Sequence, residues 1–123
     1  MTSAREIRGS IGFHAGLAAE ACIANDYERR GYLIAARRWR GQGGEIDLVA
    51  RNSEGLVFIE VKKSRTFDRA LERLSQRQVA RLYATAEEFL SSEPDGLATN
   101  VRFDVAVMNA QGDIRVIENA LMQ

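Results

Sequence analysis

The 123-residue sequence is poor in the side chains that form cross-links and soft metal sites, with one cysteine (Cys22) and one histidine (His14). A lone cysteine excludes an internal disulfide framework, and a lone histidine is too little for a zinc site. Apolar runs are also short, so the sequence predicts neither a membrane span nor a signal-peptide core. We therefore expect a cytoplasmic protein with no membrane partner, and we expect Cys22 to be a small buried residue.

The net charge is zero, because the chain has 17 basic and 17 acidic residues. Their distribution is uneven: residues 29–81 hold 13 basic and six acidic side chains, whereas residues 83–123 hold two and seven. The central part therefore predicts a basic surface suited to a polyanion, although a mixed solvated surface would give the same count. The length is that of one domain, which we predict over residues 1–123 with a loosely ordered start at 1–12.

Residues 44–62 carry the most informative pattern, two β-rich runs around a polar loop. This pattern predicts an antiparallel hairpin with a four-residue loop between Arg51 and Leu56. One register gives every apolar residue an apolar partner: Ile46 with Val61, Leu48 with Ile59, Val49 with Phe58, and Ala50 with Val57. The same register sets Asp47 opposite Glu60 and Glu45 opposite Lys62.

Two carboxylates and a lysine would then converge on one face of the hairpin. Like charges that face each other destabilise a sheet unless a cation compensates, and carboxylate oxygens suit Mg²⁺ or Mn²⁺. Such a metal activates water and polarises a phosphoryl oxygen, while an ammonium group neutralises developing charge. The pattern therefore indicates phosphodiester cleavage at Asp47, Glu60 and Lys62. The structural alternative is a half-exposed hairpin with a solvated Glu60–Lys62 pair.

The segments Gly43–Leu48 and Val57–Lys62 resemble the YraN-like family of small bacterial proteins, a branch of the PD-(D/E)XK nuclease superfamily that is similar to archaeal Holliday junction resolvases and restriction endonucleases. The resemblance implies a metal-dependent endonuclease that acts on DNA, including structured or branched DNA. It also assigns roles by position: metal-binding carboxylates at Asp47 and Glu60, a carbonyl ligand at Val61, the catalytic lysine at Lys62 and an accessory acid at Glu20.

The chain departs from the superfamily pattern at two positions. Ile46 stands where the superfamily usually has a proline, and Ser64 stands where relatives often have a basic residue. Neither departure removes a proposed ligand. Glu20 keeps a second interpretation, because an acid on the inward flank of a helix can also pair with a nearby arginine.

Periodicity predicts the order α-βββ-α-ββ. A first helix is expected from about Phe13 to Arg30 with Gly31 as its C-cap, and a second helix follows the capping box of Ser75 and Gln78. Strands are expected at residues 32–36, at the two runs of the hairpin, and at residues 101–107 and 113–119. The crossover through the second helix places the strands around it parallel. We therefore predict a restriction-endonuclease-like α/β fold, a mixed central sheet with a helix on each side.

Several residues near the candidate site predict contacts with nucleic acid. Lys63 and Arg65 follow Lys62, and four arginines spaced by four would form one phosphate-binding ridge if the whole stretch is helical: Arg69, Arg73, Arg77 and Arg81. Gln78 has two interpretations, a helix cap and a contact near the reactive phosphate. Trp39 also has two, stacking on a base and packing against the sheet. Asp104 is expected at a sheet edge or behind the metal ligands.

The function that we predict is Mg²⁺- or Mn²⁺-dependent endonucleolytic hydrolysis of DNA. The alternative is a catalytically silent module that binds nucleic acid or supports assembly and keeps the nuclease fold. The two differ in whether Asp47 and Glu60 bind a metal ion. Cleavage of both strands of a duplex would require a homodimer.

Overall fold

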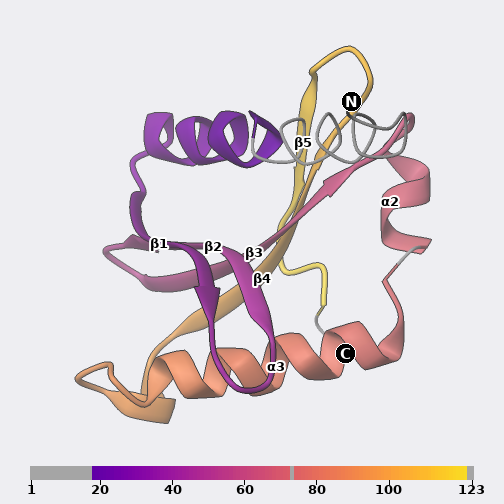
Figure 1. Ribbon diagram of the computed structural model, residues 1–123. Coiled ribbons are helices and arrows are strands. Elements are labelled where there is room, and N and C mark those ends of the chain that lie inside the picture. Colours follow the sequence, from indigo (N-terminus) through magenta and orange to yellow (C-terminus); the bar gives the residue numbers. More distant parts are fainter. Residues whose placement is uncertain (1–17, 73, 122–123) are drawn as a thin grey trace, which may run out of the picture.

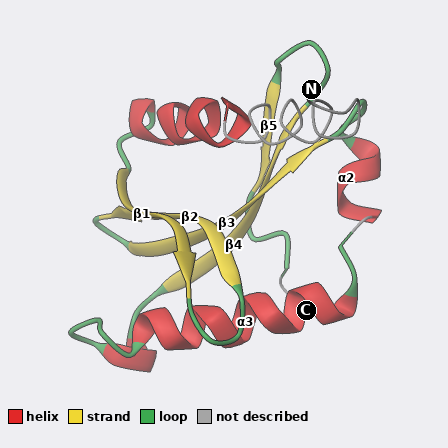
Figure 2. Cartoon of the chain, in the orientation of Figure 1, coloured by secondary structure: helices red, strands yellow, loops and turns green. Residues whose placement is uncertain are grey.

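A mixed five-stranded sheet forms the centre of the computed structural model, which describes residues 18–72 and 74–121 (Figures 1 and 2). The strands are β1 (Leu33–Arg40), β2 (Glu45–Asn52), β3 (Gly55–Lys63), β4 (Val101–Met108) and β5 (Ile114–Ile117). They lie in the order β1-β2-β3-β4-β5, and β3 and β4 are parallel while the other neighbours are antiparallel. The predicted mixed sheet is therefore confirmed.

Helices cover both faces of this sheet. The first helix, described over residues 18–29, lies on one side, and α3 (Gln76–Leu90) lies on the other (Figure 1). Gly31 follows the first helix at a φ of 97°, a left-handed conformation that suits glycine at a helix end. The predicted capping box opens α3, because the Ser75 side chain accepts the N–H of Gln78 and the Gln78 side chain accepts the N–H of Ser75. Residues 1–17, with the predicted loose start, lie outside the described residues.

The core has two parts, one on each face. Leu82, Ala86 and Phe89 of α3 pack on Val49 and Phe58 of the sheet. On the other face, three residues of the first helix meet the alternate residues of the central strands: Ile23, Ala24 and Tyr27 against Leu48, Ala50, Val57 and Ile59. Burial of each large side chain contributes about 1.5–3 kcal/mol. The helix-sheet-helix layering follows from strands that are apolar on both faces.

The predicted hairpin register is confirmed in its central part. Val49 pairs with Phe58, and the ladder runs from Leu48–Ile59 to Asn52–Gly55. The predicted four-residue loop is wrong, since strand pairing leaves only residues 53–54 between Asn52 and Gly55. Asn52 causes the tighter turn, because its Oδ1 accepts the N–H groups of Glu54 at 2.9 Å and Gly55 at 3.2 Å.

At its other end the ladder between β2 and β3 stops at Leu48 and Ile59. The pairs that we predicted beyond it, including Asp47 with Glu60 and Glu45 with Lys62, are therefore not ladder pairs. Ile46 and Leu48 should share a face in a regular strand, yet they belong to opposite core clusters. Arg38, on the neighbouring strand, has a φ of 49°. Both strands of the β1–β2 hairpin are thus irregular beside Asp47, and the hairpin end passes over α3 (Figure 1).

Two further expectations are wrong. Cys22 is exposed, because it lies on the outer side of the first helix, away from Ile23 and Ala24. The single helix over residues 69–81 that one arginine ridge requires is not formed, since α2 (Asp68–Glu72) and α3 are separate helices. A short 3₁₀ helix, η1 (Gly96–Ala98), follows α3. Among the described helices, none is both long enough and apolar enough to span a membrane.

Candidate active site

Asp47 lies where β2 leaves β3, and its side chain takes over the contact between the two strands. The N–H of Val61 donates to Oδ2 of Asp47 at 2.8 Å. This bond lies just beyond Leu48 and Ile59, the last pair of the ladder, and it joins the two strands where their backbone pairing has ended. The carboxylate of Asp47 is therefore held against β3 beside Glu60, although the register there is not the one predicted.

Glu60 and Lys62 extend from the same face of β3, two residues apart. The Lys62 Nζ lies 3.4 Å from Oε1 of Glu60, and the two side chains are 19% and 17% exposed. Such an ion pair is largely removed from bulk water but stays open on one side. The structure thus brings together Asp47, Glu60 and Lys62, as the sequence predicted.

The two carboxyl groups disfavour each other's ionisation. Burial, and after it the neighbouring Asp47, raise the pKa of Glu60 to about 7 against the opposing charge of Lys62. Burial also raises the pKa of Asp47, while the bond from Val61 and the charge of Lys62 act in the other direction. One lysine therefore does not compensate two half-buried carboxylates, and the pair holds a proton near neutral pH.

Glu20, on the first helix, lies within electrostatic reach of the same cluster. Burial raises its pKa, Asp47 raises it further, and Arg38 lowers it. Both predicted surroundings of Glu20, the acid cluster and an arginine, are thus present. Among the described residues, however, no group of three or more His, Cys, Asp or Glu side chains is arranged to hold a metal ion.

A pocket of about 170 Å³ opens beside Glu60, between β2 and α3. Gln78 and Arg81 of α3 line it together with Gly44 and Glu45 of the β1–β2 hairpin and with Leu82. Gln78 has the capping role that we considered, and it reaches the pocket as well. The pocket therefore has an acid on its sheet side and a guanidinium on its helix side.

The other residues predicted to contact nucleic acid are less closely placed. Lys63 and Arg65 are exposed just after Lys62, and Arg77 is exposed on α3 without lining the pocket. Arg73 lies outside the described residues. Of the predicted nucleic-acid contacts, the structure thus brings Gln78 and Arg81 directly to the acid pair.

Glu45 is a residue of the site whose partner we predicted wrongly. Its carboxylate accepts Nε of Arg38 at 3.1 Å and Nη2 of Arg40 at 3.3 Å, instead of facing Lys62. The reason is that Glu45 pairs with Arg40 across the β1–β2 ladder, while the ladder to β3 has already ended. Basic residues at alternate positions of β1, facing an acid of the following run, were the available signal in the sequence.

Glu88 was not predicted to matter, and it holds the β1–β2 loop on α3. Its two carboxylate oxygens accept the N–H groups of Gln42 and Gly43, each at 2.7 Å. Trp39 adds an edge contact with Phe89 at a ring distance of 5.3 Å, so its packing interpretation is confirmed. These contacts fix the loop that leads into Glu45 and Asp47.

Asp104 is a buried structural acid and does not lie on an edge strand, since β4 lies between β3 and β5. It is 1% exposed and accepts the hydroxyl of Tyr27 at 2.7 Å, Nε of Arg102 at 2.8 Å and the N–H of Asn119 at 3.0 Å. This network ties the first helix to β4 and to the turn after β5. All its groups are partnered, as buried charges require.

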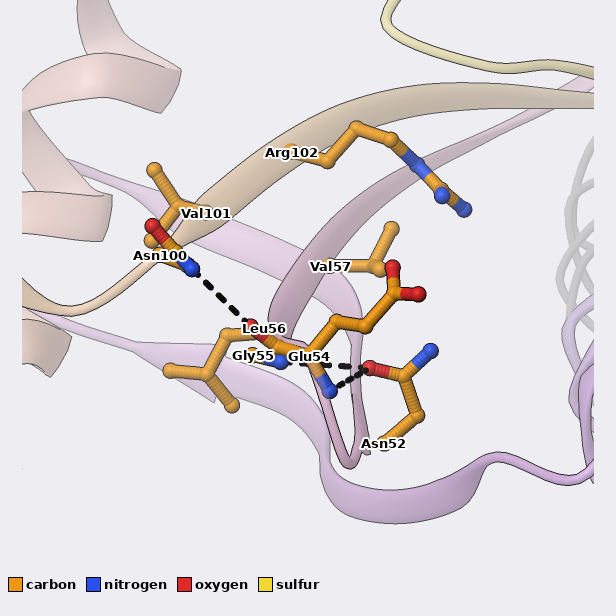
Figure 3. A pocket seen from close by; sticks show the side chains of 8 residues that line it. All are labelled: Asn52, Glu54, Gly55, Leu56, Val57, Asn100, Val101 and Arg102. Carbon is orange, nitrogen blue, oxygen red and sulfur yellow. Dashed lines mark hydrogen bonds between the residues drawn. The ribbon is translucent and has the colours of Figure 1, made fainter.

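A second pocket, of about 210 Å³, lies around Gly55 and Leu56 where β3 begins (Figure 3). Lys62 is near the other end of this strand. Its polar groups are engaged in the β2–β3 turn: Asn52 accepts two N–H groups and Asn100 donates to the carbonyl of Glu54 at 3.2 Å (Figure 3). Arg102 is bound to Asp104. The paired acids and the lysine are at the opposite end of the strand, which makes the first pocket the better candidate site.

Comparison with known proteins identifies the family. Residues 19–108 match the model of Uncharacterised protein family UPF0102. A UPF0102 protein of Roseobacter denitrificans is 52% identical over 122 residues, covering 99% of this chain and 95% of that protein. One of Ruegeria pomeroyi is 54% identical over 113 residues, covering 92% of both, and one of Dinoroseobacter shibae is 44% identical over 122 residues, covering 99% and 91%. The resemblance to YraN-like small bacterial proteins is confirmed at this level, and the chain belongs to the UPF0102 family.

Proposed function

We propose that the protein is a divalent-metal-dependent endonuclease that hydrolyses phosphodiester bonds in DNA, as the resemblance to the PD-(D/E)XK superfamily implies. The observation that supports this most is the half-buried pair of Asp47 and Glu60 with Lys62 beside it at 3.4 Å. Two acids and a lysine at the end of a strand ladder are costly for the fold. A function at this point accounts for that cost.

The donor set fits a hard divalent cation. Asp47 and Glu60 would hold Mg²⁺ or Mn²⁺, and by the resemblance the carbonyl of Val61 would add a third oxygen. Magnesium is often bound by one or two carboxylates with water and substrate phosphate completing its shell, so a third acidic ligand is not required. Burial and the neighbouring Asp47 raise the pKa of Glu60, and a bound cation would oppose both effects. When bound, the metal supplies a Lewis acid for a phosphoryl oxygen and acidifies a bound water.

Lys62 would act on the reacting phosphate directly. Its ammonium is held by Glu60 on one side, and the side chain as a whole is 19% exposed, so the ammonium would donate to a phosphate oxygen or orient an attacking water. Glu20 would assist from the first helix, since it already interacts with Asp47 through space. Asp47 and Glu60 keep their orientation because Val61 and Lys62 bind them in the free protein.

The substrate would lie between the sheet and α3. Arg81 and Gln78 line the pocket next to Glu60, and Lys63, Arg65 and Arg77 are exposed on the segments that lead to it. Such residues bind the phosphate backbone without regard to sequence, which suits recognition of DNA by its shape. Structured or branched DNA is the substrate that the resemblance favours, and cleavage of two strands would require a homodimer.

The second candidate function is a silent module that binds nucleic acid. The absence of a three-acid metal group among the described residues favours it. In that case the arginines and lysines would bind DNA, while Asp47 and Glu60 would have a structural role only.

Cleavage of a panel of linear, flapped and four-way DNA substrates separates the two candidates. We expect the parent to cut at least one substrate with Mg²⁺ or Mn²⁺ and none in chelator. Asp47→Asn should abolish the cleavage, while Asp95→Asn, a change at an exposed acid after α3, should not. DNA binding without cleavage of any substrate in either metal would favour the silent module.

A further inference from the structure

Glu45 joins two arginines of β1 to the acid pair. Each of its carboxylate oxygens is engaged by one arginine, Oε1 by Arg38 and Oε2 by Arg40. Glu45 also lines the pocket next to Glu60. Glu45 thus lies between this two-arginine cluster and the border of the candidate site.

This cluster is accessible and locally strained. Arg38 is 40% exposed and Arg40 is 78% exposed, although both reach the same carboxylate. Arg38 also has a φ of 49°, a strained conformation for a residue other than glycine, and such residues cluster at functional positions. Next to them, Arg37 is 52% exposed, and its ion pair with Glu28 is long at 3.7 Å. The outer edge of β1 therefore presents a strip of guanidinium groups.

We infer that Arg38 and Arg40 form a second phosphate-binding wall of the site, opposite Arg81 on α3, and that Glu45 occupies in the free protein the place that a DNA phosphate takes. The inference rests on the proposed function, and it names the surface on which the DNA would lie. Carboxylate and phosphate oxygens are both anionic acceptors for a guanidinium N–H, and each arginine contacts a single oxygen of Glu45. A phosphate backbone that replaced Glu45 would satisfy both guanidinium groups.

The geometry makes this wall continuous with the acid pair. Arg40 pairs with Glu45 across the ladder, and Asp47 follows two residues later on β2. Gly44 and Glu45 line the same pocket as Arg81. A DNA strand that contacted both walls would therefore place a phosphate over Asp47, Glu60 and Lys62.

Binding of DNA in chelator tests the inference apart from cleavage. Fluorescence anisotropy with a labelled four-way junction, over a range of salt concentrations, gives Kd for each variant. The double variant Arg38→Gln/Arg40→Gln should bind about tenfold more weakly, and its plot of log Kd against log salt should be shallower by about two. Arg40→Lys should bind like the parent within about twofold, since a phosphate contact needs the charge. Arg115→Gln, on β5 at the far side of the sheet, is the control and should change nothing.

Glu45→Gln should have the opposite effect and strengthen the binding of DNA. It removes a charge that competes with DNA for both arginines, so Kd should fall roughly two- to fivefold. When Glu45→Gln is added to the Arg38→Gln/Arg40→Gln variant, the gain in affinity should be less than half of that in the parent. Thermal unfolding of each variant checks the fold, and the exposed Arg40→Gln alone, compared with Arg40→Lys, carries the test if the double variant unfolds.

Two results would overturn the inference. Unchanged binding by the β1 variants, together with weaker binding by Arg81→Gln, would confine the DNA to the α3 wall and leave the proposed function standing. Weaker binding by Glu45→Gln would mean that Glu45 is needed to orient the arginines and is not displaced. A parent protein that binds no DNA would end both this inference and the proposed function.

Discussion

Replacement of Glu60 by glutamine should stabilise the metal-free protein at alkaline pH. Glutamine keeps the shape of the side chain and removes one of two carboxylates that lie together beside one lysine. Most substitutions of buried residues destabilise a protein, so a gain in stability would be informative. The expected gain arises because glutamine carries no charge, so neither the cost of burying a charge nor the repulsion by Asp47 remains.

The pKa of Glu60 determines whether Glu60→Gln stabilises the protein and over which pH range it does so. Its rise from 4.5 to about 7 means that the folded protein holds this proton more tightly than the unfolded chain does. The stabilising contribution of this proton to the free energy of unfolding is therefore fully present below pH 4.5 and is lost as the pH rises through 7. The complete shift corresponds to about 3 kcal/mol. Because Asp47 and Glu60 titrate as a pair, we expect about 1–2 kcal/mol of it to be recovered by Glu60→Gln.

Urea unfolding in chelator at a series of pH values measures this effect. The difference in unfolding free energy between Glu60→Gln and the parent should be near zero at pH 4.5 and should rise by about 1–2 kcal/mol by pH 8. Glu87→Gln, at an exposed acid of α3, is the matched control and should show no such rise. A difference that stays constant with pH, or one that becomes more unfavourable for Glu60→Gln as the pH rises, would refute the reasoning.

Three other predictions concern metal binding, the β1–β2 loop and the buried Asp104. The thermal midpoint of the parent should rise as Mg²⁺ or Mn²⁺ is added, because a ligand of the folded state stabilises it by mass action, and Glu60→Gln should respond much less; calorimetry that shows equal responses would remove Glu60 from the metal site. Glu88→Ala should lower the unfolding free energy by about 1–3 kcal/mol, since two N–H groups of the β1–β2 loop lose their charged acceptor. Glu87→Ala is its control in urea unfolding, and equal losses in the two variants would show that the loop does not depend on Glu88. Asp104→Ala should cost about 3–5 kcal/mol by leaving Arg102 and Tyr27 without their buried partner, and a loss below about 1 kcal/mol in the same assay would contradict the structural role of Asp104.

The fold was predictable because its signals are local. Short runs of apolar and β-branched residues mark the central strands, the capping box marks the start of α3, and Gly31 marks the end of the first helix. The pairing of Val49 with Phe58 followed from matching apolar residues across the hairpin. Local patterns of this kind carry the element order and the central register without any tertiary information.

The site was predictable in its residues but not in its geometry. Asp47, Glu60 and Lys62 meet as expected, yet through a side-chain bond to the N–H of Val61, because the ladder between β2 and β3 ends at Leu48 and Ile59. Where a ladder ends depends on contacts between distant segments, and alternation in the sequence does not report it. The contact of Glu88 with the loop has the same origin: it joins residues 45 or more positions apart.

The single-turnover cleavage rate of Lys62→Ala tests the central claim most directly. The lysine lies 3.4 Å from Glu60 at the proposed reacting phosphate, whereas Arg115, on β5 at the far edge of the sheet, serves as the control. With Mg²⁺ and a cleavable DNA substrate, Lys62→Ala should lose at least about 100-fold in rate and keep its Kd for DNA within about threefold. Arg115→Ala should cleave at nearly the parental rate. Equal cleavage by Lys62→Ala and the parent would contradict the assignment of this site as a nuclease centre.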